Sequence, residues 1–466
     1  MPEEATKGEA RVMIKNREQL LSHGCVEGRR LAADIIDTAL REVDPYTATK
    51  KTVRWNDKDG LLRVQDDVFD LNDVKHLYVV GAGKATYAIA RALDEILGER
   101  IRDGLVVVKE GQSEKLSHIR VIEAGHPIPD ERSTEACKQV FEIVDQAGPD
   151  DLVITVVTGG SSALCSHPVP GITFDEKRTV HDLLLRCGAD IREINTVRKH
   201  LSAIKGGRLT QRILPATIVS LCVSDVIHDP LDWNTDWTAP DSSTLADAAN
   251  VFSRYGLWDK IPESVRDHLS NPAPEKETPK AFPGAPLHLY MVLKTRTLCE
   301  AAVTRAEELG LSPVLVTTSL NGESREVGRT LAAIAKEVHL SGNPVNPPCA
   351  LIAGGETTVR IESHTVGEGG PNQELALAGC LDLEANEPIV ICAVDSDGMD
   401  GSSTVAGAMT DGSTLARAKQ NGFDCFKTLM DHKALALLKT LDDVVITGST
   451  GTNVNDLAVC IVLSQA

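Results

Sequence analysis

Short apolar runs alternate along this chain with stretches of helical periodicity, and this alternation restricts the possible fold more than any other feature. Most of the runs in the first half are almost continuously apolar and rich in β-branched residues, as in strands covered on both faces. Helical spacing is found at residues 85–97 and 132–147, and an earlier helix is predicted over 19–40. The pattern predicts a parallel α/β sheet. The runs assigned to strands are residues 76–80, 104–108, 152–157 and 218–223.

A change in amino-acid composition divides the chain. Its 466 residues are enough for two to three domains. Residues 271–286 hold five prolines and several charges, which suits a stiff polar linker. We therefore predict an N-terminal α/β domain at 15–270 and a C-terminal α/β domain at 287–466. We expect both to be Rossmann-like with largely parallel sheets, and the active site to lie in the cleft between them.

The alternation resumes after the predicted linker. Helices are expected at 298–309 and 325–340. No convincing residue-level repeat relates the two halves. The strands expected in the second domain are residues 287–293, 314–317, 350–353, 389–393, 444–447 and 457–463.

Charge and composition exclude several function classes. The formal net charge is −19, so nucleic acids and anionic membranes are poor partners. No uninterrupted apolar stretch of about 18 residues exists, and the first thirty residues lack a secretory core, so we expect a cytoplasmic protein. Eleven cysteines without a Cys-x-x-Cys pair indicate buried small side chains rather than a disulfide framework or zinc site. The oligomeric state is left open.

The segment Gly81-Ala82-Gly83-Lys84 joins a predicted strand to a predicted helix. A strand, a glycine turn and a helix start form an anion cradle, because backbone N–H groups and the helix dipole face a phosphate. The third glycine of a dinucleotide fingerprint is missing, and the loop is too short for a Walker P-loop. We interpret Gly81, Gly83 and Lys84 as phosphate-handling residues; an ordinary βα turn with a solvated lysine is the alternative.

A second glycine loop, Thr158-Gly159-Gly160-Ser161-Ser162, follows the strand predicted at 152–157. Gly159 and Gly160 allow close backbone approach to a ligand, and Ser161 and Ser162 can donate to phosphate oxygens. A nucleophilic serine is a rival interpretation, but no Gly-x-Ser-x-Gly elbow is present. A plain tight turn is the other alternative.

Residues 192–212 are a positive island in an acidic protein. Arg198, Lys199 and Lys205 are predicted to converge on Gly206-Gly207 as an anion clamp for carboxylate or phosphate. The alternative is a solvated basic helix face.

Acidic and polar loops supply the complementary half of a site. Asp225 follows one predicted strand, and Asp395 and Asp397 follow another. These carboxylates suit Mg²⁺, which takes one or two carboxylates together with phosphate oxygens and water; ordinary Asx turns are the alternative. Gly354-Gly355-Glu356 is a further polar loop at a strand end. So many polar loops favour a large polyanionic ligand such as a nucleotide.

Taken together and in order, these motifs resemble the class II glycerate kinases over nearly the whole chain. The carboxy-terminal motifs at 354–358 and 450–454 resemble the MOFRL domain of that family. The resemblance implies a two-domain α/β enzyme that phosphorylates D-glycerate from ATP with Mg²⁺ to give 2-phosphoglycerate, with Lys84 as the active-site lysine. The amino-terminal motifs that carry it are residues 81–84, 125–130, 158–163, 195–202 and 205–208.

Two alternatives remain beside the kinase. Such sequences have also been called hydroxypyruvate reductases, although a complete dinucleotide fingerprint is missing. A catalytically weak nucleotide-binding protein is the third possibility, because the chain departs from the family pattern. Pro371 stands where the family has arginine, and residues 233–238 replace a family loop.

Overall fold

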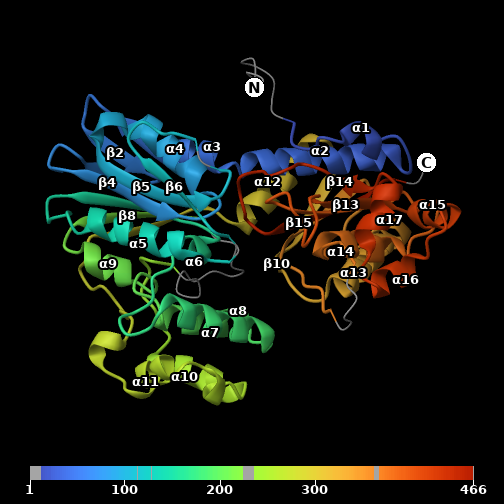
Figure 1. Ribbon diagram of the computed structural model, residues 1–466. Helices are drawn as coiled ribbons and strands as arrows, with labels where there is room; N and C mark the ends of the chain where they lie inside the picture. The colour runs from blue at the N-terminus through green and yellow to red at the C-terminus, as the bar shows by residue number, and fades with distance from the viewer. Residues whose placement is uncertain (1–11, 113, 127, 224–235, 362–366, 465–466) are drawn as a thin grey trace. The chain divides into compact units, whose positions relative to one another are not determined.

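The computed structural model describes residues 12–112, 114–126, 128–223, 236–361 and 367–464 (Figure 1). The chain divides into two compact units. One holds Pro45–Leu293, and the other combines the chain up to Asp44 with the chain from Lys294 onward.

The unit Pro45–Leu293 is built on a six-stranded parallel sheet in the order β6-β5-β4-β7-β8-β9. Numbered along the chain, this order is 3-2-1-4-5-6, which is that of a doubly wound dinucleotide fold. The predicted Rossmann-like parallel sheet is therefore confirmed for this unit. Its strands are β4 (Leu77–Ala82), β5 (Ile101–Lys109), β6 (Arg120–Ala124), β7 (Leu152–Val157), β8 (Thr217–Val223) and β9 (Leu287–Leu293).

The direction of winding reverses between β4 and β7, which are neighbours in register from Leu77↔Leu152 to Ala82↔Val157. The loops after these two strands touch each other. A Cβ on Gly83, whose φ is +142°, would lie 1.9 Å from Thr158 Oγ1, so only glycine fits this approach. Ligands of such sheets bind where the winding reverses, at the carboxyl ends of the strands. The fold therefore places both predicted glycine loops at its expected ligand site.

A layer of helices with its own apolar core completes this unit. Leu184 of α7, Val197 of α8 and Phe252 of α10 belong to that core. α7 and α8 each begin with a capping box, in which Thr173 and Asp190 bond the first turn. The helices of this layer are α7 (Phe174–Arg186), α8 (Ile191–His200), α10 (Leu245–Arg254) and α11 (Glu263–Ser270), and they lie beside the sheet in Figure 1.

The other elements of the unit are shorter or cover the sheet. They are α3 (Pro45–Thr52), α4 (Thr86–Leu97), α5 (Glu131–Val144), α6 (Ser161–Leu164), α9 (Arg208–Ile213), and an antiparallel sheet of β1 (Val53–Asn56), β2 (Leu61–Val64) and β3 (Asp67–Asp70).

The second unit carries a six-stranded mixed sheet in the order β10-β11-β15-β12-β13-β14. The α/β class is confirmed, but the expectation of a largely parallel sheet is wrong here. Only β10 and β11 pair in parallel, and β15 runs antiparallel between β11 and β12. Strands buried on both faces are continuously apolar in either direction, so the pattern does not distinguish the two. The strands are β10 (Ser312–Leu320), β11 (Cys349–Gly355), β12 (Ile389–Asp395), β13 (Gly407–Asp411), β14 (Val444–Val445) and β15 (Asp456–Val462).

Helices from both ends of the chain pack in this second unit. The expected helix 19–40 is interrupted, because Gly24 has a φ of +68° and the main helix begins only at Val26. The fully buried Arg29 of that helix bonds Asp411 at 2.5 Å and Asp443 at 2.9 Å. The helices are α1 (Arg17–Leu20), α2 (Val26–Glu42), α12 (Thr295–Glu308), α13 (Ser324–Ser341), α14 (Pro371–Cys380), α15 (Thr414–Gln420), α16 (Cys425–Met430) and α17 (Ala434–Thr440).

This division by contacts differs from the predicted boundaries at 15, 271–286 and 287. α2 belongs with the C-terminal segment because of the Arg29 ion pairs. β9 pairs with β8 and so completes the first sheet instead of opening the second. No local pattern in the sequence indicates that α2 packs with the C-terminal segment or that β9 pairs with β8.

None of the helices in the described residues is long and apolar enough to cross a membrane.

Candidate functional site

A cavity of about 460 Å³ lies within the unit Pro45–Leu293, between the loop after β7 and one face each of α7 and α8. Gly159, Gly160, Ser161 and Ser162, all predicted as binding residues, line it. It therefore adjoins the carboxyl end of β7, at the reversal of winding.

Helical periodicity directs the polar side chains of α7 and α8 into this cavity. Lys177 and His181 are four residues apart on α7, and Asn195 and Arg198 are three apart on α8, so each pair lies on one face of its helix. Lys205, from the turn after α8, closes the set. Three cationic side chains thus come from separate segments to one cavity.

The cations bond neutral groups. Lys205 is 1% exposed, and its Nζ donates to Ser162 Oγ at 2.7 Å. Lys177 Nζ donates to Ser166 Oγ at 3.1 Å. Arg198 Nη1 donates to Asn195 Oδ1 at 3.2 Å. Within the described ranges, no carboxylate forms an ion pair with Lys177, Arg198 or Lys205.

The pKa values reflect this concentration of buried positive charge. Burial lowers the pKa of Lys177 to about 8 and that of Arg198 to about 10. Burial, followed by repulsion from Lys177 and Arg198, holds the pKa of Lys205 well below its usual range. Burial and then Arg198 lower the pKa of His181 to about 4, so this imidazole is neutral near pH 7 and accepts from the Arg198 guanidinium at 3.1 Å. Because an anion would offset these costs, the cavity has the electrostatics of an anion site.

This arrangement predicts that anion binding weakens as the pH rises through about 8. Lys177 is protonated below its pKa of about 8 and neutral above it, so its attraction for an anion is present at pH 7 and lost by pH 9. Calorimetry with sulfate, whose charge is constant over this range, should show an affinity about tenfold lower at pH 9 than at pH 7. Lys177→Met should flatten this dependence, and an unchanged slope in that variant would assign it to another group.

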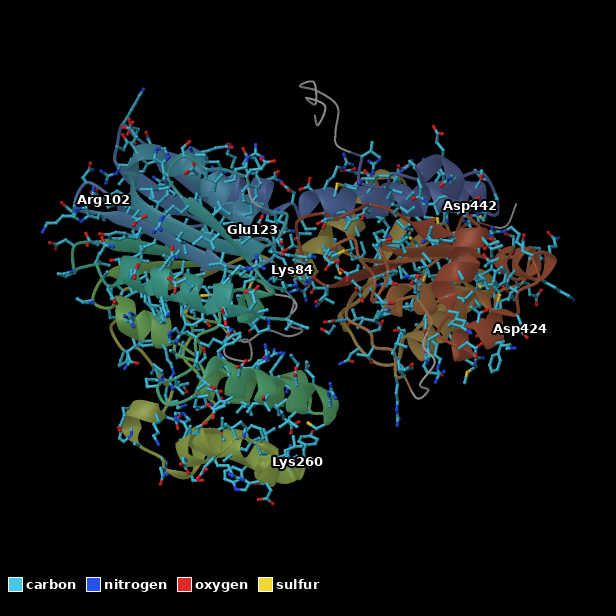
Figure 2. The ribbon with its side chains drawn as sticks, viewed as in Figure 1. Lys84, Arg102, Glu123, Lys260, Asp424 and Asp442 are labelled. Carbon is cyan, nitrogen blue, oxygen red and sulfur yellow. The ribbon has the colours of Figure 1, made fainter. Side chains whose placement is uncertain are left out.

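Lys84 lies beside the same loop. Its backbone N–H donates to the Gly159 carbonyl oxygen at 2.8 Å, and its Cγ would be 3.2 Å from a Cβ on Gly160. Figure 2 shows Lys84 at the carboxyl end of the sheet, whereas Arg102 lies at the opposite end. Gly81 and Gly83 bring β4 against Val156 and Thr158. The two predicted glycine loops and Lys84 thus form one structural feature.

The predicted clamp is assembled differently from the expectation. Lys199 points away from the cavity and is 3% exposed; its Nζ bonds Asp241 Oδ1 at 2.5 Å. Gly206 and Gly207 are buried, and a Cβ on Gly207 would meet the Ala239 carbonyl and the Phe282 ring. They form the turn into α9 and are not part of the cavity lining. Lys177 takes the position that the sequence assigned to Lys199.

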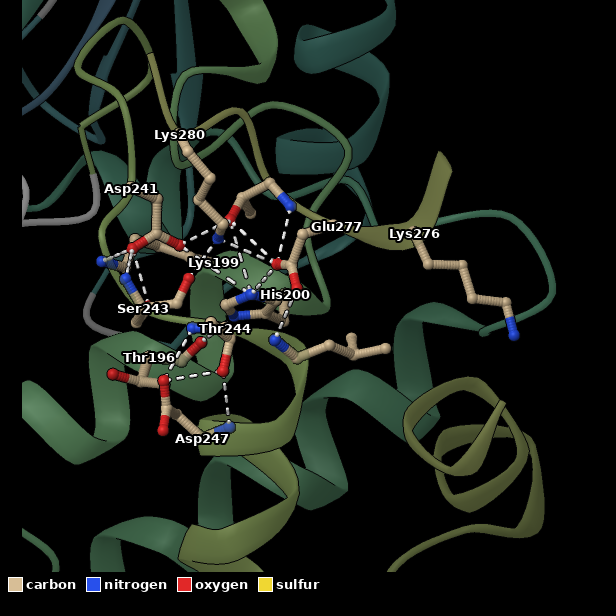
Figure 3. A network of polar contacts seen from close by, with 12 residues as sticks. Thr196, Lys199, His200, Asp241, Ser243, Thr244, Asp247, Lys276, Glu277 and Lys280 are labelled. Carbon is tan, nitrogen blue, oxygen red and sulfur yellow. Dashed lines mark hydrogen bonds and ion pairs between the residues drawn. The ribbon is translucent and has the colours of Figure 1, made fainter. Parts of the chain in front are cut away.

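Lys199 instead belongs to a polar network that anchors α8 (Figure 3). Thr278 Oγ1 donates to Asp241 Oδ2 at 2.9 Å, and His200 Nε2 lies 2.8 Å from Glu277 Oε1. Although burial would raise it, hydrogen bonds from the Leu245 N–H, Lys280 and His200 lower the pKa of Glu277 to about 2. Glu277 of the predicted stiff linker is therefore bonded to the helix that carries Arg198.

The remaining predicted residues lie in the other compact unit or outside the described residues. Gly354 and Gly355 pack against Cys299 and Leu320, and Glu356 is exposed. Asp395 Oδ1 accepts from the Asp397 N–H, and Asp397 Oδ1 from the Met399 N–H, both at 2.8 Å. Such bonds are typical of Asx turns. Asp225 and residues 233–235 fall outside the described residues.

Pro371 is the first residue of α14, a position at which proline is well tolerated. Asp400 completes this helix start, since its two oxygens accept from the N–H groups of Asn372 at 3.0 Å and Gln373 at 2.9 Å. At the first position of a helix the missing N–H of proline interrupts no intrahelical hydrogen bond.

Two polar side chains that line the cavity are not indicated by any motif of the sequence. Lys177 and His181 lie in an amphipathic segment outside the glycine-rich loops and the basic segment 192–212. The one available signal was the capping box Thr173-x-x-Glu176, which marks the start of a helix in which both residues share a face.

Comparisons with known proteins show the family of this chain. The family described as a domain of unknown function, DUF4147, matches residues 31–270, and the MOFRL family matches residues 349–456. A glycerate 2-kinase of Pyrococcus horikoshii is 38% identical over 94% of this chain and 98% of its own length. The chain belongs to the class II glycerate kinase family.

Two further relatives carry different names, one that of a reductase and one that of a kinase. A putative hydroxypyruvate reductase of Agrobacterium vitis is 41% identical over 93% of this chain and 94% of its own. The crystal structure of the glycerate kinase of Thermotoga maritima superimposes with a TM-score of 0.81 at 37% identity, covering 93% of this chain and 99% of that one. The family's α/β architecture is thus shared along almost the whole chain.

Proposed function

We propose that this protein transfers the γ-phosphoryl group of ATP to D-glycerate and forms 2-phosphoglycerate. The observation that carries the proposal is the set of three buried cations beside a glycine-serine loop at the reversal of winding. Phosphoryl transfer needs positioning and neutralisation of spread negative charge rather than a covalent catalyst. The cavity supplies these requirements.

Different residues of the cavity would bind the phosphate oxygens and neutralise their charge. Ser161, Ser162 and the backbone at Gly159-Gly160 offer donors to phosphate oxygens. Lys177, Arg198 and Lys205 neutralise the phosphate charge, and Lys84 at the edge of the loop stabilises charge that develops during transfer. Neutral His181 holds the Arg198 guanidinium in place.

The fit to Mg²⁺ rests on a pair of carboxylates in the other unit. Asp395 and Asp456 are directly opposite on β12 and β15. Burial and then the charge of Asp395 hold the pKa of Asp456 well above its usual range, a conflict that a divalent cation relieves. The described residues form no group of three or more potential metal ligands, but Mg²⁺ commonly uses only one or two carboxylates. Asp395 and its neighbour in the same loop, Asp397, are the proposed ligands, and bound Mg²⁺ would neutralise the negative charge of these carboxylates.

Activity should therefore require Mg²⁺ and depend on this acidic loop. EDTA should abolish ADP release, and added MgCl₂ should restore it. The double variant Asp395→Asn, Asp397→Asn should need at least tenfold more Mg²⁺ for half-maximal rate, because each change removes a negative ligand. A Mg²⁺ titration that matches the wild type would show that the loop is only a turn.

A coupled assay separates the proposed kinase from its two alternatives. The kinase predicts ADP release that depends on D-glycerate, with 2-phosphoglycerate identified by its conversion in an enolase-coupled assay. NADH oxidation with hydroxypyruvate would instead indicate the reductase for which one relative is named. Nucleotide binding without either reaction would indicate a binding protein.

A further inference from the structure

Three of the exposed large apolar side chains of this protein line the mouth of the same cavity. Ile128, Leu185 and Ile191 are 69%, 58% and 53% exposed. They come from three segments: the loop after β6, the end of α7 and the start of α8. Apolar side chains that gather in water at the edge of a cavity mark a surface that a ligand covers.

The cavity is graded from a cationic end to this apolar end. On α7, Lys177 and Leu185 are eight residues apart, or about 12 Å along the axis. On α8, Arg198 and Ile191 are seven residues apart, or about 10 Å. Because only residues 187–190 join the two helices, Leu185 and Ile191 both lie at the connected end.

This grading describes a ligand with a polyanion at one end and an apolar group about 10 Å away. A three-carbon hydroxy acid has no apolar part and is far smaller than a cavity of 460 Å³. A nucleotide has both parts, with its phosphates and its purine base at opposite ends.

We infer that Ile128, Leu185 and Ile191 bind the purine base of the nucleotide, whose phosphates are held by Lys177, Arg198 and Lys205. This inference rests on the proposed function and deepens it by giving the nucleotide a place and an orientation in one unit. The base buries apolar surface that is otherwise in contact with water.

The test compares two probes on the full chain in the presence of MgCl₂. ADP carries a base and pyrophosphate does not, so calorimetry with each separates the two ends of the cavity. The double variant Leu185→Ser, Ile191→Ser should weaken ADP binding about tenfold and leave pyrophosphate binding unchanged. Both side chains are more than half exposed, so their replacement leaves the core intact. Leu340→Ser is the matched control, because Leu340 is 72% exposed on α13 in the other unit.

Other outcomes overturn the inference. Unchanged ADP affinity in the double variant, or an equal loss for both probes, would show that the apolar residues do not contact the base. A change in oligomeric state by light scattering with unchanged ADP affinity would assign them to a contact between copies. If the wild type phosphorylates glycerate while the double variant keeps its ADP affinity, only this inference fails. If the wild type neither binds ADP nor releases it from ATP with glycerate, the proposed function fails first.

Discussion

Lys84→Ala is expected to lower kcat for glycerate phosphorylation on the order of a hundredfold or more, while the melting temperature stays that of the wild type. The side chain is half-buried at the edge of the Gly159-Gly160 loop and belongs to no apolar core. A lysine in that position stabilises charge that develops during transfer, and removal of such a group typically costs this much. Steady-state kinetics together with thermal unfolding measure both effects.

Lys260→Ala is the matched control. Lys260 is exposed in the same unit, distant from Lys84 in Figure 2. It should leave kcat unchanged. If Lys84→Ala releases ADP at the wild-type rate, or if it merely lowers the melting temperature, the assignment of Lys84 to catalysis is wrong.

The second large effect is expected for Arg198→Ala, which removes one of the three buried cations of the cavity. Its kcat/KM should fall by about thirty- to a hundredfold, because a buried charge-assisted contact to phosphate is lost. The KM for ATP should rise more than the KM for glycerate, since the cations are proposed to hold the nucleotide's phosphates. A rise confined to the KM for glycerate would instead assign Arg198 to the substrate carboxylate.

Arg212→Ala separates a placed cation from general charge. Arg212 comes from the same basic segment, but its guanidinium bonds Asp145 on the surface at 2.5 Å. Exposed pairs of this kind contribute little, so the variant should retain wild-type kinetics. Equal losses in both variants would mean that overall charge, not position, matters.

Arg198→Ala should not lower the melting temperature, because it removes a buried charge that has no carboxylate partner among the described residues.

Many strands, helices and loops of the unit Pro45–Leu293 could be predicted because they depend on patterns among neighbouring residues. Residues 152–157 were predicted as a strand and form β7, and the helix expected at 85–97 is α4 from Thr86. An unbroken apolar run must be buried on both faces, and a glycine turn before a helix can adopt few conformations. The loops at 81–84 and 158–162 were chosen for the same reason, and they do lie together.

The rest depends on contacts between distant segments. Lys177 was missed because no local pattern shows that α7 faces the loop after β7. Lys199 was predicted as a ligand because its buried partner, Asp241, lies 42 residues later in the chain. Patterns among neighbouring residues do not indicate such a pairing. The same limit applies to α2, because the partners of its Arg29, Asp411 and Asp443, lie at the other end of the chain.

The sequence by itself determined the α/β class, the positions of most strands and the glycine loops, because apolar periodicity and backbone freedom are properties of neighbouring residues. Only the tertiary structure decided the order of the strands, the antiparallel course of β15, and which cations of the basic segment enter the cavity. The physical reason is that burial and ion pairing depend on what packs against a residue. Arg198 and Lys199 are adjacent in the chain and on one helix, yet they face different surroundings: Arg198 lines the cavity, and Lys199 bonds a buried carboxylate.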